Sequence, residues 1–147
     1  MSQLLKILYD VAGIRTDYRH LHNDLLGFSR RRLIRLLKPA DAGLLSARSA
    51  ALAEVGTRLS RARKELVSLG EADISIRRGR EIQAALDDYA QALSVCIDLL
   101  AQVDAHLQNP QRNATVNPML DLKAAYDDAL QHQKRLGTRL TRIASSI

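Results

Sequence analysis

The chain has 147 residues, a formal net charge of +6 and 46% hydrophobic residues, which fits one globular domain of ordinary size. Aromatic residues make up only 3%, and there are three prolines and seven glycines. A β-sandwich or barrel needs more turn residues and more β-branched residues, so the composition predicts an all-α fold. Cys96 is the only cysteine, which excludes an internal disulfide and a cysteine-based metal cluster.

The location expected from the sequence is the cytoplasm. The first residues, MSQLLKILYDVAG, do not resemble a signal peptide, because Lys6 and Asp10 interrupt their apolar run. No stretch approaches the roughly 20 apolar residues that a membrane-spanning helix needs.

The first long helix is expected over residues 14–38. Its apolar face carries Leu21, Leu25, Phe28, Leu33, Leu36 and Leu37. Residues 2–12 form either a separate short helix or an early part of this one, since Gly13 favours a break or a kink.

The second helix is expected over residues 40–69. Its apolar residues alternate in steps of three and four, the spacing that packs one helix along another; they are Leu52, Val55, Leu59, Ala62, Leu66 and Leu69. Pro39 and Asp41 mark its start, and Gly70 ends it.

The third helix, over residues 71–108, carries the longest such seam. It consists of Ile82, Leu86, Tyr89, Leu93, Cys96, Leu100, Val103 and Leu107. The pair Asn109-Pro110 stops the helix.

The fourth helix is expected over residues 118–146, with Asn117 as its cap and Pro118 in its first turn. Its seam is Leu122, Tyr126, Ala129, Gln133, Leu136, Leu140, Ile143 and Ile147. Gln133 is a polar residue on this apolar seam, and such a residue can fix helix register or oligomeric state.

Short connections between long helices predict antiparallel neighbours. The sequence therefore predicts one domain over residues 1–147, an up-down four-helix bundle with coiled-coil-like helices. Seams of this length are also compatible with a homodimer.

This topology gathers basic residues at one end of the bundle, which we call the basic pole. Its members are Arg58, Arg61, Arg63 and Lys64 from the second helix, Arg77, Arg78 and Arg80 from the third, and Lys134, Arg135, Arg139 and Arg142 from the fourth. The helix dipole favours cations at helix C-termini but not at the N-terminus where Arg77, Arg78 and Arg80 lie. The arginines of the pole are therefore candidate ligands of an anion, such as nucleic acid or polyphosphate.

A second basic cluster lies on the first helix. It consists of Arg30, Arg31, Arg32, Arg35 and Lys38.

We expect neither a metal ion nor a cofactor. Asp17 with His20, and Asp128 with His132, are isolated pairs rather than the larger ligand sets of metal-binding bundles. Clustered glycines of a phosphate-binding loop are also lacking. We interpret the histidines near residue 22 as incidental residues on a solvated helix.

Residues 15–22, R-T-D-Y-R-H-L-H, resemble the ribonuclease motif of the HEPN family in the spacing from Arg15 to His20 or to His22. That resemblance implies a helical bundle in which Arg15 and His20 act near a scissile phosphate. Residues 33–70 are similar in size and pattern to the helical export chaperones of flagellar and type III secretion systems.

The function expected first is that of a non-enzymatic interaction protein, such as an adaptor, chaperone or assembly subunit, which binds a protein partner or a second copy through an exposed helix face. One alternative is a nucleic-acid or polyphosphate binder that uses the basic pole. A second alternative is an HEPN-like ribonuclease.

Overall fold

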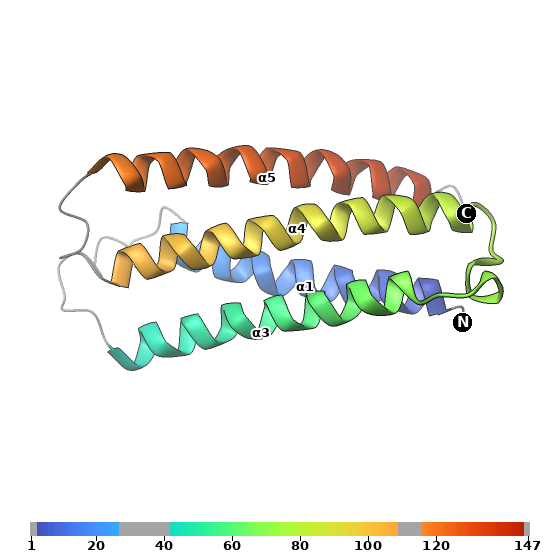
Figure 1. Cartoon of the computed structure of the whole chain (residues 1–147), viewed down its shortest axis with the longest axis horizontal. Helices are drawn as coiled ribbons and strands as arrows, with labels where there is room; N and C mark the ends of the chain where they lie inside the picture. The colour runs from blue at the N-terminus through green and yellow to red at the C-terminus, as the bar shows by residue number, and fades with distance from the viewer. Residues whose placement is uncertain (1–2, 27–41, 109–115, 146–147) are drawn as a thin grey trace.

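The computed structural model describes residues 3–26, 42–108 and 116–145, and it confirms an all-α helical bundle (Figure 1). Helices α1 (Gln3–Leu26), α3 (Ala42–Val67), α4 (Gly79–Gln108) and α5 (Val116–Ser145) run alternately up and down. A short 3-10 helix, η1 (Glu71–Ile74), lies between α3 and α4. Within these ranges, no helix is long and apolar enough to cross a membrane.

Helix α4 is the central element of the bundle. It packs against α3, α5 and α1, whereas α5 packs on α4 and makes no comparable contact with α1 in the described ranges. The predicted α4 seam is confirmed, because its residues from Ile82 to Val103 are at most 3% exposed. Helices α3 and α5 flank α4 on opposite sides (Figure 1).

Of the two alternatives left open for residues 2–12, the structure confirms that they are an early part of the first helix, because α1 runs through Gly13 without the break that this glycine favours. A second seam explains the continuity: Leu4, Ile7, Val11 and Ile14 are all at most 2% exposed. A glycine inside a helix costs about 1 kcal/mol relative to alanine, whereas each fully buried aliphatic side chain contributes about 1.5–3 kcal/mol. The free energy gained by burying these four side chains therefore exceeds the cost of the glycine.

The remaining helix boundaries shift from the expected ones. Helix α3 covers residues 42–67 of the expected 40–69, and α5 begins at Val116, ahead of the expected cap Asn117. The segment expected to continue the first helix to residue 38 lies outside the described residues beyond Leu26, and so does the second basic cluster.

Helix α4 begins eight residues later than expected, at Gly79, because a turn precedes it. The backbone NH of Gly79 donates to the carbonyl of Ile76, and Arg78 adopts a positive φ of 59°. A Cβ on Gly79 would lie 1.9 Å from the carbonyl oxygen of Ile74. This turn therefore requires glycine at position 79.

A buried ion pair ties α3 to α4 toward the other end of the bundle. Arg48 Nε donates to Asp104 Oδ1 at 2.7 Å, and Ser49 Oγ donates to Asp104 Oδ2 at 3.1 Å. Asp104 is only 1% exposed, so its charge depends on these partners.

Candidate functional site

The weak contact between α1 and α5 leaves a groove between these two helices. Along α1, Tyr18 and Arg19 each lie three or four residues from both Arg15 and His22, so these four residues share one helix face. Opposite them, Leu130, Gln133 and Lys134 share a face of α5 for the same reason. These side chains, with Asn23, line a cavity of about 310 Å³ that we call the α1–α5 recess.

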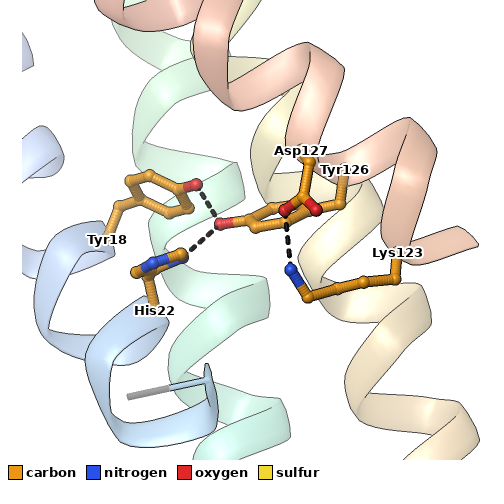
Figure 2. A network of polar contacts seen from close by, with 5 residues as sticks. All are labelled: Tyr18, His22, Lys123, Tyr126 and Asp127. Carbon is orange, nitrogen blue, oxygen red and sulfur yellow. Dashed lines mark hydrogen bonds and ion pairs between the residues drawn. The ribbon is translucent and has the colours of Figure 1, made fainter. Parts of the chain in front are cut away.

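A polar network joins the two helices at the edge of this recess (Figure 2). The hydroxyl groups of Tyr18 and Tyr126 are hydrogen-bonded to each other, and His22 Nδ1 lies 2.7 Å from the Tyr126 hydroxyl. The rings of His22 and Tyr126 are stacked, with their centroids 5.6 Å apart. If Tyr18 donates to Tyr126 and Tyr126 donates to His22 Nδ1, all three groups are satisfied and His22 keeps its proton on Nε2.

The two tyrosines act as hydrogen-bonding groups and not as nucleophiles. Burial, followed by the hydrogen bond with Tyr126, raises the pKa of Tyr18 far above its ordinary value. Burial is also the main cause that raises the pKa of Tyr126, with the Tyr18 hydrogen bond opposing it. Both hydroxyl groups therefore stay protonated at neutral pH.

His22 lies in a positive electrostatic environment. Its pKa is lowered, first by burial and then by Lys134 and Lys123, while Asp127 opposes the shift. Lys123 is paired with Asp127 at 2.6 Å, as Figure 2 shows. The imidazole is therefore neutral at pH 7.

Three cations surround the recess without a carboxylate among its lining residues. They are Arg15, Arg19 and Lys134, and none of them forms an ion pair with a residue that the structure describes. Deeper in the groove, Gln133 Nε2 donates to the Tyr89 hydroxyl at 2.7 Å, so the polar seam residue expected to fix register is satisfied within the chain. The recess is thus suited to a negatively charged group.

The groove continues from the recess as an apolar channel of about 440 Å³, which we call the apolar groove. Arg15 belongs to both sections and stands at their junction. The other residues that line the apolar groove carry no charge; they are Leu5, Leu8, Tyr9, Val11, Ala12, Tyr89, Gly137, Leu140, Thr141, Ala144 and Ser145. Together the two sections form an amphipathic groove with one basic end.

The basic pole is brought together only in part. The end of α3, the start of α4 and the end of α5 do lie at the same end of the bundle (Figure 1). Three of its arginines are taken up by ion pairs: Arg58 with Asp17 at 2.5 Å, Arg78 with Glu81 at 2.6 Å and Arg80 with Glu71 at 3.1 Å.

Five further arginines of the basic pole are exposed and form no ion pair within the described ranges; they are Arg61, Arg77, Arg135, Arg139 and Arg142. Arg63 is half-buried, and its Nε has no hydrogen-bond partner among the described residues. Arg135 and Arg139 lie on α5 away from its buried face, whereas Arg61 lies on α3, across the bundle. Anion binding by this pole stays a prediction.

The HEPN-like spacing from Arg15 leads to either His20 or His22, and the structure brings only His22 together with Arg15. Arg15 lines the recess, while His20 is exposed and outside it. His22 is the histidine that shares the recess with Arg15, and it is not the incidental solvated residue we expected. Ribonuclease activity stays untested by this arrangement.

Sequence reasoning missed most of the recess. Gln133, and Tyr126 in the adjoining network, were recognised only as seam positions, Lys134 was assigned to the basic pole, and Arg19 was not singled out. The seven-residue step from Arg15 to His22, which places both on one helix face, is the signal that could have found the α1 wall.

Within the described residues, no group of three or more His, Cys, Asp or Glu side chains could hold a metal ion. Cys96 is buried beside Tyr18, and burial raises the pKa of its thiol to about 11. No protein-family model, curated protein or solved structure matches this chain. The function is therefore argued from the site alone.

Proposed function

We propose that this chain is a non-enzymatic binding protein whose α1–α5 recess recognises a carboxylate or phosphate group. The observation that carries the proposal is the set of three cations, Arg15, Arg19 and Lys134, around a recess that no acidic side chain of the described residues lines. This proposal keeps the class of function that the sequence favours and moves the binding site away from the basic pole. A cytoplasmic location remains part of the proposal.

The expected affinity for a simple anion is modest. Partly exposed charge-assisted contacts contribute about 1 kcal/mol each. Three or four of them correspond to a dissociation constant in the millimolar range, since about 4 kcal/mol corresponds to 1 mM. The recess therefore fits the recognition of one charged group within a larger ligand.

Titration followed by two-dimensional amide NMR tests the proposal. The probes are inorganic pyrophosphate, butyrate and a short polyglutamate peptide, which separate a phosphate, a small organic acid and an acidic protein segment. At constant ionic strength we expect saturable shifts in residues 15–23 and 130–134. The pKa of His22 should rise on binding, because the anion offsets the effect of Lys134 and Lys123.

Matched variants locate the binding. Arg15→Gln and Lys134→Gln should each weaken binding severalfold, whereas Arg61→Gln, which removes an exposed arginine of α3, should not. Equal losses in all three variants, or no saturable shift with any probe, would contradict the proposal.

A second candidate is nucleic-acid binding by the basic pole, favoured by the exposed and unpaired Arg77. Such binding would rest on phosphate contacts and fall steeply with salt. This function would be established if labelled RNA binds at low salt, if Arg77→Glu abolishes this binding, and if Arg15→Gln leaves it unaffected. Undetectable binding to RNA at low salt would remove it.

A further inference from the structure

The α1–α5 recess does not end at Arg15, and its continuation indicates what the anionic group is attached to. The apolar groove follows α1 from Arg15 back to Leu5 and follows α5 from Gly137 to Ser145. Ten residues of α-helix correspond to about 15 Å. A ligand that fills both sections therefore has a charged head group and an apolar chain of comparable length.

The distribution of charge along the groove fits a hydrocarbon chain with an anionic head group. Among the described lining residues Arg15 is the only charged one, and it stands at one end of an apolar groove about 15 Å long. A linear hydrocarbon chain with an anionic group at one end presents the same order of charged and apolar surface.

The walls and floor of the groove support the same ligand. Ala12, Gly137 and Ala144 leave the walls low, and the Tyr89 ring forms the floor. A Cβ on Gly137 would approach that ring to 3.1 Å, so α5 lies close over the floor at this point. Tyr9 stands at the edge of the groove and is 65% exposed, an unusual position for a large aromatic side chain.

We propose that the ligand is a linear long-chain carboxylate of about twelve carbons, with its head group in the α1–α5 recess and its chain along the apolar groove. Arg15, at the junction of the two sections, pairs with the carboxylate, and Arg19 and Lys134 complete the positive end. The inference rests on the proposed function, because it uses the same recess for the head group.

A chain-length series tests the inference. Dissociation constants of butyrate, hexanoate, octanoate, decanoate, dodecanoate and tetradecanoate are measured by calorimetry below their micelle concentrations. Full burial of two methylene groups raises the affinity more than tenfold. In a half-open groove, each added pair of methylene groups should therefore raise the affinity about fourfold. The gain should stop near twelve carbons, where the groove ends at Leu5. Dodecyltrimethylammonium, which has the same chain and the opposite charge, should not bind.

Two tryptophan substitutions locate the chain. Ala12→Trp should fill the groove from α1 and reduce the affinity for dodecanoate to that for butyrate, while pyrophosphate still binds in the recess. Ala144→Trp provides the same test from α5, and Ala124→Trp, on the exposed side of α5, is the matched control that should leave both ligands unaffected.

The outcomes separate the two proposals. Binding of pyrophosphate and butyrate without any dependence on chain length would overturn the long-chain ligand and leave the anion site standing. A 16-residue acidic amphipathic helical peptide that binds in the groove, in place of the carboxylates, would also overturn it. Loss of all anion binding would overturn both proposals, and dodecanoate binding that survives Ala12→Trp and Ala144→Trp would place the chain elsewhere.

Discussion

Replacing Tyr126 by phenylalanine removes the centre of the polar contact between α1 and α5. Its hydroxyl is bonded to that of Tyr18 and lies 2.7 Å from His22 Nδ1, so two hydrogen bonds are lost while the ring remains. Each bond contributes about 0.5–1.5 kcal/mol. Tyr18, which is 3% exposed, would keep only the thiol of Cys96, a weak partner. We expect the free energy of unfolding to fall by about 1.5–3 kcal/mol.

The reciprocal substitution should cost less. In Tyr18→Phe the Tyr126 hydroxyl still bonds to His22, so only one hydrogen bond is lost, at about 0.5–1.5 kcal/mol. The double variant leaves no buried hydroxyl without a partner, so its loss should not exceed that of Tyr126→Phe alone. The two substitutions are therefore expected to be strongly non-additive.

Urea unfolding followed by circular dichroism measures these differences, and 1 kcal/mol corresponds to about 2–4 °C in Tm for a chain of this size. Tyr9→Phe is the control, because the 65% exposed Tyr9 should contribute nothing measurable through its hydroxyl. Additive losses, or a Tyr126→Phe variant as stable as the wild type, would refute the reasoning, because they would mean that the hydroxyl groups are independent and solvated.

Five further substitutions follow from the structure. Gly79→Ala should lower the free energy of unfolding by at least about 2 kcal/mol, because the new Cβ would collide with a backbone carbonyl. Gly13→Ala should raise it by about 0.5–1 kcal/mol, because the new Cβ would point into open space. Urea unfolding measures both changes. Asp104→Ala should cost about 3–5 kcal/mol in the same assay, since it leaves a buried guanidinium unpaired. The pKa of His22 is lower in the folded chain than in the unfolded chain, so the unfolded chain binds a proton at this residue more readily as the pH falls below 6.5. The free energy of unfolding therefore decreases on acidification. In His22→Gln, the urea midpoint should depend less on pH between 7.5 and 5. Lys134→Glu should raise Tm by about 1–3 °C by pairing with the recess arginines and should abolish pyrophosphate binding, and a lower Tm would contradict this.

The fold could be predicted from the sequence because the seams of α3 and α4 are nearly uninterrupted. Heptad spacing decides which face of a helix is buried, and short connections decide that neighbours are antiparallel. The seam from Leu4 through Ile14 has the same spacing, and it favours the continuous helix over the separate short helix that was left open beside it. A single glycine costs less than one buried leucine contributes, so this seam could have decided between the two alternatives.

The α1–α5 recess could not be predicted in the same way. A seam identifies the buried face of a helix but does not say which pair of helices stays apart. Arg15 and Lys134 are more than a hundred residues apart in the chain, and only the central position of α4 brings them to the same groove. Topology brings the helix ends of the basic pole to one end of the bundle, but Lys134 lines the recess, and local carboxylates such as Glu71 and Glu81 pair with arginines of the pole.

The composition of the gap between α1 and α5 also explains why the gap exists. Arg15 and Arg19 of α1 line the same recess as Lys134 of α5, and like charges oppose closer contact. Further along, Ala12 and Ala144 line the apolar groove, and their small side chains fill little space. A chain selected for stability alone would place a carboxylate at position 134 and larger apolar residues at positions 12 and 144. Three cations that form no ion pair with a described residue lower stability beside an apolar groove, and this cost is expected if the proposed ligand site is kept open.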